Sequence, residues 1–114
     1  MKKFIVLFIL VFFVGMNSTA FAHQPKEVLL DYDQETGQIT VTVIHPTPSP
    51  DTHYIDRIEI LVNGDMVLDA EPPRQGPKEL TVTYPIPRLN SKDQVIAVAF
   101  CNRWGEKRGE ITIP

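Results

Sequence analysis

The stretch Gln38–Ile44, with the sequence QITVTVI, decides the fold because polar and apolar side chains alternate from its first residue to Val43. Ile39, Val41 and Val43 would lie on one face of an extended chain, with threonines on the opposite face. A period of two residues is typical of a β-strand that buries one face, and β-branched side chains favour that conformation. We therefore expect a strand here that contributes its apolar face to a hydrophobic core.

Similar short apolar runs occupy the rest of the chain, and residues that favour turns separate them. Asn63-Gly64, between two of these runs, is a pair that often closes a two-residue hairpin. No stretch carries a helical stripe, and a parallel sheet would need crossover helices. We predict an all-β fold, a seven-stranded immunoglobulin-like antiparallel β-sandwich. Its strands are expected over residues 28–32, 38–44, 57–62, 66–69, 80–84, 96–100 and 110–113.

The N-terminus has the organisation of a secretory signal peptide. Two lysines precede an apolar run over residues 4–14, and small residues ending at Ala22 follow it. The run is shorter than the roughly 20 residues that a membrane-spanning helix needs. We expect residues 1–22 to be a cleaved signal peptide, residues 23–114 to form a single domain, and the protein to be secreted or periplasmic. An uncleaved N-terminal anchor is the alternative.

The net charge argues against a polyanionic partner. The formal charge of the chain is −3, and removal of residues 1–22, which hold two lysines and no acidic residue, lowers it to −5. No basic run follows that segment. Nucleic acids and anionic lipids attract basic proteins, so we expect neither a nucleic acid nor, after signal cleavage, a membrane as partner.

Three histidines and one cysteine are the candidate metal ligands. They are His23, His45, His53 and Cys101. His45 and His53 stand at the two ends of a proline-rich loop, and a hairpin-like connection would bring these ends together. Three imidazoles and a thiolate suit iron, zinc or copper far better than calcium or magnesium. A lone cysteine in an exported chain has no intramolecular disulfide partner, and metal ligation is one explanation for it.

Ordinary structural roles compete with a metal site. A lone histidine is usually exposed or hydrogen-bonded, and a lone cysteine usually behaves as a small buried apolar residue. The separation of His45 and His53 is also too long for a zinc finger. On spacing alone, both interpretations stay open.

Four separated motifs resemble those of the superoxide reductases, specifically the iron-binding domain of desulfoferrodoxin and neelaredoxin. They are His-Xaa-Pro at residues 23–25, His-Pro at 45–46, His-Tyr-Ile at 53–55, and Cys-Asn at 101–102 with Gly105 after it. The resemblance covers nearly all of residues 23–114 and keeps the order of the motifs. It implies a seven-stranded sandwich, which the strand pattern predicts independently.

The resemblance also implies a mononuclear non-haem iron site. In that family four equatorial histidines and one axial cysteine hold the iron, and superoxide is reduced to hydrogen peroxide at the open sixth position. Position by position, His23, His45 and His53 match three of the histidines. Cys101 matches the thiolate, which would donate electron density and be the catalytic residue. An external electron donor is implied, because a chain with one cysteine cannot contain the four-cysteine rubredoxin-like domain of some members.

The sequence departs from the family pattern at several points. The family has Cys-Asn-Xaa-His-Gly, and here Trp104 takes the place of the fourth histidine, with an indole nitrogen that cannot bind a metal. Ala22 stands where the family typically has a lysine that attracts superoxide, and the loop between His45 and His53 is longer than usual. We expect backbone amides from Asn102 onward to bond the sulfur. We also expect weaker iron binding, with reductase activity reduced or lost.

Two other functions fit the same residues. If His23 becomes the mature N-terminus, its α-amine and imidazole could bind copper in a periplasmic protein, with His45 or His53 completing the site. The third possibility is a metal-free immunoglobulin-like binding module, with Trp104 and Arg103 as contact residues. A tryptophan more often covers the edge of a core, and we expect that role for Trp104.

Overall fold

The computed structural model describes residues 24–114, so the predicted signal peptide and His23 lie outside the described residues. The described part consists of seven strands joined by turns and loops. In chain order they are β1 Glu27–Asp33, β2 Gln38–Ile44, β3 Ile55–Val62, β4 Asp65–Ala70, β5 Glu79–Pro85, β6 Gln94–Cys101 and β7 Glu106–Thr112. Within residues 24–114 there is no helix with the length and apolar character needed to span a bilayer.

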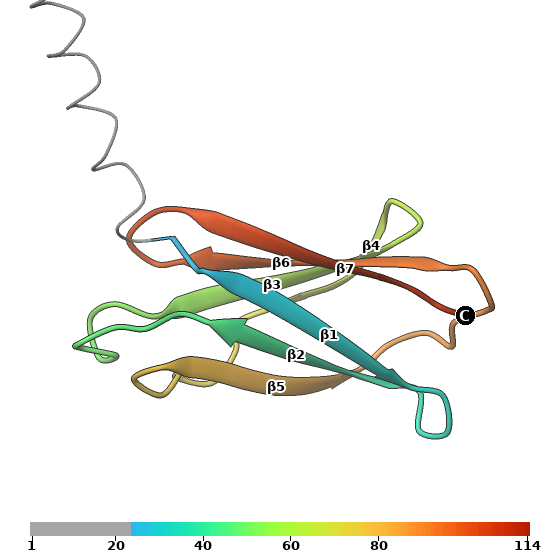
Figure 1. The fold of residues 1–114 in the computed structure, drawn as a ribbon, viewed down its shortest axis with the longest axis horizontal. Coiled ribbons are helices and arrows are strands. Elements are labelled where there is room, and N and C mark those ends of the chain that lie inside the picture. Colours follow the sequence, from blue (N-terminus) through green and yellow to red (C-terminus); the bar gives the residue numbers. More distant parts are fainter. Residues whose placement is uncertain (1–23) are drawn as a thin grey trace, which may run out of the picture.

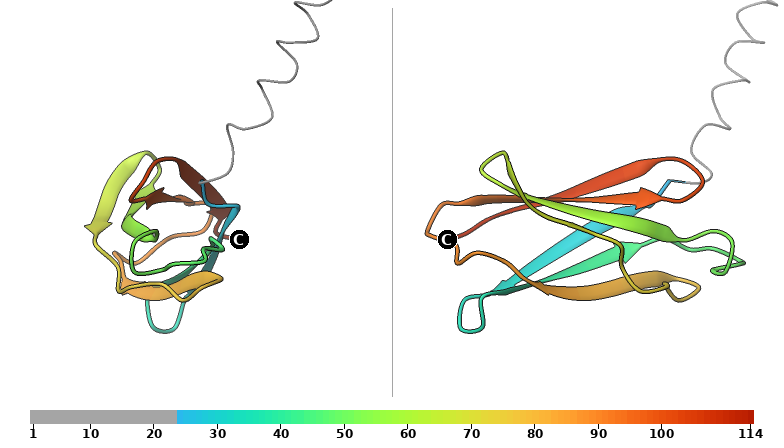
Figure 2. Two further views of the ribbon diagram at one scale, coloured as in Figure 1. Left: turned by 90° about the vertical axis from the view of Figure 1, so that its left-hand side faces the viewer. Right: turned by 180° about the vertical axis from the view of Figure 1, so that it is seen from behind.

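The strands form two sheets that pack face to face (Figure 1). One sheet has the order β1-β2-β5 and the other the order β4-β3-β6-β7, and every pairing is antiparallel. The connections after β2, β4 and β5 pass from one sheet to the other, as in immunoglobulin-like sandwiches. Figure 2 shows the two layers from one end and from behind. The predicted fold class is confirmed.

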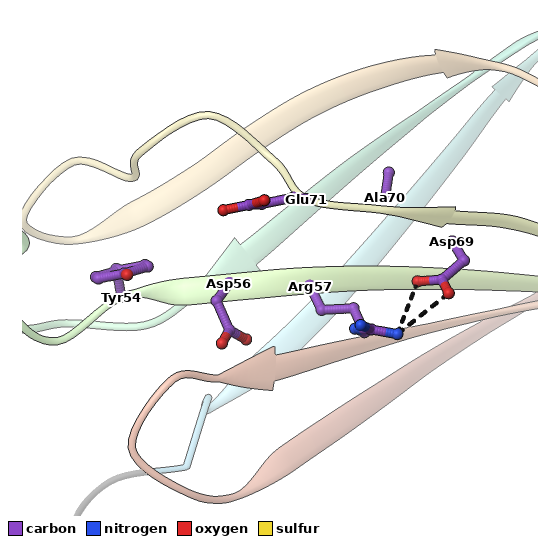
Figure 3. Close-up of a pocket in the computed structure, with 6 residues that line it drawn as sticks. All are labelled: Tyr54, Asp56, Arg57, Asp69, Ala70 and Glu71. Atoms are coloured by element: carbon purple, nitrogen blue, oxygen red, sulfur yellow. Dashed lines mark hydrogen bonds and ion pairs between the residues drawn. The ribbon is translucent and has the colours of Figure 1, made fainter.

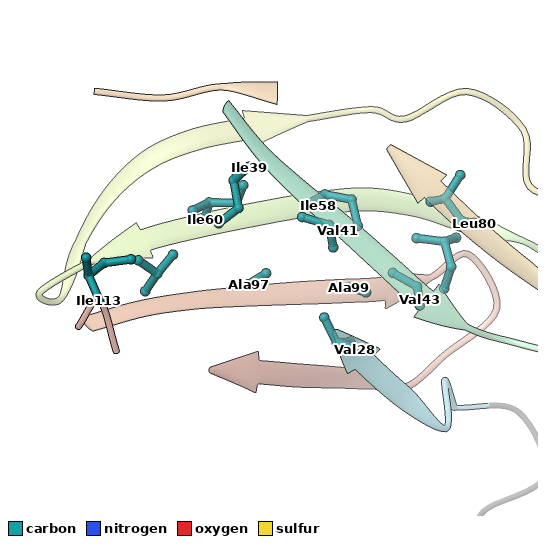
Figure 4. Packing of buried hydrophobic residues seen from close by; sticks show 12 residues of the cluster. Val28, Ile39, Val41, Val43, Ile58, Ile60, Leu80, Ala97, Ala99 and Ile113 are labelled. Carbon is teal, nitrogen blue, oxygen red and sulfur yellow. The ribbon is translucent and has the colours of Figure 1, made fainter. Parts of the chain in front are cut away.

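The core lies between the sheets and uses alternate side chains of the central strands (Figure 4). Ile39, Val41 and Val43 of β2 have no exposed surface, and Ile58 and Ile60 of β3 are buried as completely. Each such side chain contributes roughly 1.5–3 kcal/mol when it leaves water. The alternation in β2 is therefore a large part of what holds the two sheets together.

Strand β6 buries a different face from the one that its most apolar residues suggest. Ile96, Val98 and Phe100 share one face, whereas Ala97 and Ala99 between them point into the core. Because β6 is an inner strand of the four-stranded sheet, both of its faces are apolar and alternation alone does not identify the core side. The fully buried residues of the core face are Val95, Ala97 and Ala99.

The turns at strand ends agree with the sequence in one case and differ in another. Asn63 and Gly64 have φ angles of 50° and 88°, so the predicted hairpin between β3 and β4 is confirmed. The prediction of a hairpin-like connection between His45 and His53 is wrong, because β2 pairs with β1 and β5 and not with β3. That loop crosses from one sheet to the other.

The sandwich has two distinct ends (Figure 1). The end that we call the site end holds the start of β1, the β2–β3 loop (residues 45–54), the β4–β5 connection (71–78) and the β6–β7 turn (102–105). The end that we call the far end holds the β1–β2 turn, the β3–β4 hairpin and the β5–β6 connection. Segments distant in sequence therefore meet at the site end.

Candidate metal centre

Three of the four predicted ligands converge at the site end. Potential ligand atoms of His45, His53 and Cys101 all lie within 4.8 Å of one another. His53 Nε2 is 3.1 Å from Cys101 Sγ, and the two imidazole rings meet edge to face with centroids 4.8 Å apart. The side chains are 2%, 9% and 7% exposed, respectively. The predicted convergence is confirmed for these three residues, while His23 lies outside the described residues.

His45 and Cys101 reach the centre because they continue the buried faces of their strands. His45 directly follows β2 and is in step with Val43 and Val41, two and four residues earlier. Cys101 ends β6 in step with Ala99 on its core face. The period of two residues that builds the core therefore also places these two donors.

His53 reaches the centre through a β-bulge. Ile55 and Ile58 are three residues apart, so a regular strand would place them on opposite faces, yet both are buried. The pairing of β3 with β6 shifts between Ile55 and Arg57, which makes Asp56 an extra residue. The bulge restores Ile55 to the core side, and His53, two residues earlier, lies on that side as well.

The donor set and its spacing suit a transition metal. Two ligands bound to one ion at right angles, at about 2.1 Å for nitrogen and 2.3 Å for sulfur, lie about 3.1 Å apart. The observed separation between His53 Nε2 and Cys101 Sγ is 3.1 Å. A buried thiol with two buried imidazoles is also the chemistry that iron, zinc and copper prefer. His53 and Cys101 therefore have the separation expected of two adjacent ligands of one such ion.

Gln75, which the sequence did not single out, is a buried part of this centre. Its side chain lies in the β4–β5 connection and is 5% exposed. Gln75 Oε1 lies 2.7 Å from His45 Nδ1 and accepts a hydrogen bond of 2.9 Å from the backbone of Ile55. Gln75 Nε2 donates to the carbonyls of His45 and Gly76 at 2.8 and 2.9 Å. One glutamine in a proline-rich segment carries no signal from which this burial could be read.

Asn102 fixes the backbone on both sides of His53. Its Oδ1 accepts a 2.9 Å bond from the backbone of Tyr54, and its Nδ2 donates to the carbonyl of Thr52 at 3.0 Å. The backbone amide of Asn102, expected to bond the Cys101 sulfur, donates instead to the Tyr54 carbonyl at 2.9 Å. For the Asn102 amide the expectation is wrong, because pairing between β3 and β6 continues past their ends and takes this amide.

Arg74 holds the β2–β3 loop against the β4–β5 connection. Its guanidinium carbon lies 3.7 Å from the centroid of the Tyr54 ring, a cation–π contact. The same guanidinium donates to the carbonyls of Pro50 and Asp51 at 3.2 and 2.8 Å. The loop that carries His45 and His53 is thus held by Arg74 from the β4–β5 connection and by Asn102 from the β6–β7 turn.

The first described residues run along the same end. Pro25 is fully buried, and the backbone amide of Lys26 donates to the carbonyl of Ile44 at 2.8 Å. Gln24 lies against Gly105, where an added Cβ would come within 2.7 Å of the Gln24 Cβ. The chain therefore enters the sandwich between the residue before His45 and the turn that follows Cys101.

Trp104 lies in the β6–β7 turn and is 57% exposed. The expectation that it covers the edge of the core is wrong, because this turn stands at the rim, beyond the packed strands. Whether it replaces a ligand histidine stays a prediction.

A pocket of about 380 Å³ lies beside the centre and involves none of its three donors (Figure 3). Arg57 bonds both carboxylate oxygens of Asp69 at 3.1 Å along one side of it. Three carboxylates against one guanidinium make the pocket negative, which disfavours an anionic ligand. Its lining residues are Tyr54, Asp56, Arg57, Asp69, Ala70 and Glu71.

Comparison with known proteins identifies the fold. No protein-family model matches the sequence, and no curated protein does either. A hypothetical protein from Pyrococcus horikoshii aligns with a TM-score of 0.58 and 19% identity, over 85% of this chain and 94% of that chain. The superoxide reductase (neelaredoxin) from Ignicoccus hospitalis aligns with a TM-score of 0.51 and 18% identity, over 86% of this chain and 88% of that chain. The chain thus has a fold similar to that of these proteins.

Proposed function

We propose that this chain is an exported mononuclear non-haem iron protein that reduces superoxide to hydrogen peroxide, with lower activity than a site with four histidines would have. The observation that carries the proposal is the convergence of His45, His53 and Cys101 within 4.8 Å, buried at one end of the sandwich. The likeness in fold to a neelaredoxin supports it. We further propose that residues 1–22 direct export and that residues 23–114 are the mature domain.

His23 is the third histidine of the proposed ligand set. Gln24 packs on Gly105, four residues after Cys101, and Lys26 is bonded to Ile44, the residue before His45. These contacts support a histidine at position 23 as a ligand of the same ion.

Each donor would have a separate role toward the iron. When bound, iron would supply the electron that superoxide takes up with two protons to become hydrogen peroxide, and an external donor would restore that electron. Cys101 would ligate as the thiolate and raise the electron density of the site. The imidazoles of His45 and His53 would bind as neutral ligands, which keeps the charge of the site low.

The proposed lower activity follows from Trp104. Its indole nitrogen offers no lone pair to a metal, so the chain supplies four ligands at most. A site with fewer ligands is expected to hold ferrous iron more weakly, and part of the protein would be purified without metal. Arg74 and Arg103 both bond carbonyls of the β2–β3 loop, which places two positive charges at the site end. These charges would favour the approach of an anion such as superoxide.

The deciding experiment uses the full chain, expressed in a host that exports it and purified after processing. N-terminal sequencing tests for cleavage after Ala22. Iron content, superoxide consumption and the visible spectrum of the oxidised protein then test the site, because a cysteine-to-ferric charge-transfer band requires thiolate on iron. We expect bound iron, measurable consumption and that band.

His45→Ala is the variant that tests the ligand assignment, and Thr47→Val is its matched control. Both residues are buried in the same loop, but within residues 24–114 the Thr47 hydroxyl does no more than accept from the backbone of Ser49 at 3.2 Å. We expect His45→Ala to lose iron and activity, and Thr47→Val to keep both. Equal iron content in wild type and His45→Ala would contradict the proposal. Preferential copper binding, or no binding of iron, copper or zinc, would replace it with one of the alternatives.

A further inference from the structure

The amide of Gln75 has an orientation that its partners determine. The backbone N–H of Ile55 can only donate, so the Gln75 atom facing it at 2.9 Å is the oxygen. The carbonyls of His45 and Gly76 can only accept, so the atom facing them at 2.8 and 2.9 Å is the amide nitrogen. Exchanging the two atoms would break all three bonds.

This orientation determines which nitrogen of His45 carries hydrogen. Because Gln75 Oε1 is an acceptor, His45 Nδ1 at 2.7 Å must be the donor. In a neutral imidazole the other nitrogen, Nε2, then holds the lone pair that a metal requires. The side chain is 2% exposed, so water is largely excluded from competing for Nδ1.

We propose that Gln75 is a positioning residue that holds His45 in the Nδ1–H tautomer and presents Nε2 to the metal. The inference rests on the proposed function for its metal, but not for the tautomer itself. Gln75 binds both the ring and the backbone carbonyl of His45, so it sets the orientation of the imidazole as well as its protonation. Gln75 also accepts from the backbone of Ile55, which lies between His53 and the bulge at Asp56. It therefore contacts the segments that position both imidazoles.

The first test needs neither a metal nor a variant of Gln75. Long-range proton–nitrogen correlation spectra of the metal-free protein report which ring nitrogen of a neutral imidazole bears the hydrogen. Signals of His45 are identified by their loss in His45→Ala. We expect the Nδ1–H form. An Nε2–H ring in the wild type would overturn the proposal, whether or not the protein binds iron.

The second test compares Gln75→Leu with Gln75→Glu and with Gln94→Leu. Glutamate keeps an acceptor oxygen for Nδ1, whereas Gln94 makes an exposed bond of 2.6 Å to Glu110, away from the centre. We expect Gln75→Leu to lose the tautomer preference and to bind added Fe(II) about 10–100-fold more weakly. The glutamate variant and Gln94→Leu should retain the wild-type tautomer.

The outcomes separate this inference from the proposed function. A folded Gln75→Leu protein with an unchanged tautomer and unchanged Fe(II) affinity would overturn the role of Gln75. If Gln75→Leu does not fold, the spectra of wild type and Gln75→Glu decide, and an Nε2–H ring in both would overturn it. If wild type binds no Fe(II), the proposed function fails, while an Nδ1–H ring still supports the action of Gln75 on His45.

Discussion

The two ends of the sandwich each use an asparagine to join segments, but in different surroundings. At the site end, Asn102 bonds the backbone of Thr52 and Tyr54 and so encloses His53. At the far end, Asn63 accepts from the backbone of Gln94 at 3.0 Å and donates to Asp93 at 2.9 Å. The same bonds fasten a buried imidazole at one end and an exposed turn at the other.

The two ends also differ in how their buried polar groups are satisfied. At the site end, the Gln75 amide makes hydrogen bonds through both its oxygen and its nitrogen. At the far end, the buried hydroxyl of Tyr84 has no hydrogen-bond partner among residues 24–114, and burial raises its pKa. Because a buried polar group is costly unless bonded, the unpaired hydroxyl of Tyr84 should cost stability at the far end, whereas the bonded amide of Gln75 should not do so at the site end.

The largest expected difference between the ends comes from Asn102→Ala and its matched control Asn63→Ala. Both variants lose two side-chain hydrogen bonds and should lower the free energy of unfolding by about 1–3 kcal/mol. Only Asn102→Ala releases the backbone around His53, so only it should weaken Fe(II) binding, by about 10–100-fold. Urea unfolding and Fe(II) titration measure the two quantities separately. Equal metal affinity in both variants would show that Asn102 has no special role.

A second pair uses glycines with left-handed backbone conformations. Gly105 and Gly64 have φ angles of 96° and 88°, so alanine costs each about 1–2 kcal/mol of backbone strain. Only at Gly105 does the new Cβ meet Gln24, while it meets nothing within 4 Å at Gly64. Displacement of Gln24 in Gly105→Ala should weaken Fe(II) binding about tenfold, which is the lower end of the roughly 10–100-fold range expected when a residue that supports a ligand is changed. Calorimetric titration checks it, and no difference in affinity would contradict a ligand at position 23.

Tyr84→Phe tests the cost of the buried hydroxyl that lacks a hydrogen-bond partner among the described residues at the far end. Removing a buried hydroxyl that has no partner in the described part of the chain should raise the free energy of unfolding by about 1 kcal/mol. The ring stays in place, and iron content should not change. Thermal and urea unfolding measure the effect, and a loss of stability would mean that the hydroxyl makes a useful bond.

The smallest expected effect concerns acid stability at the far end. The backbone amide of Asn90, and then the side chain of Asn63, lower the pKa of Asp93 below its ordinary value of 3.8. A pKa lower in the folded state means that the stabilisation is present at neutral pH and lost as pH falls through the folded value. The difference in urea midpoint between wild type and Asp93→Ala should therefore be smaller at about pH 3 than at pH 7. A difference that does not depend on pH would contradict this assignment.

The residue pattern was enough to predict the sandwich and to place one of the three described candidate ligands, His45, on the core side. Alternation over Ile39, Val41 and Val43 indicates a strand with one buried face, and the same period carries His45 to that face. Cys101 is likewise in step with the core face of β6, although Ile96 and Phe100 draw attention to the opposite face. Alternation places His45 because a strand's faces repeat every two residues. In β6 both faces are apolar, so alternation alone does not show which face carries Cys101.

The placement of His53 and the role of Gln75 could not be read from the residue pattern. Counting back from Ile58 in steps of two residues leaves His53 on the outer face, and the bulge at Asp56, which depends on pairing with β6, reverses this. Gln75 enters the centre through bonds to His45 and Ile55, which are 30 and 20 residues away along the chain. Both features depend on contacts between distant segments, and periodicity reports only on neighbouring residues.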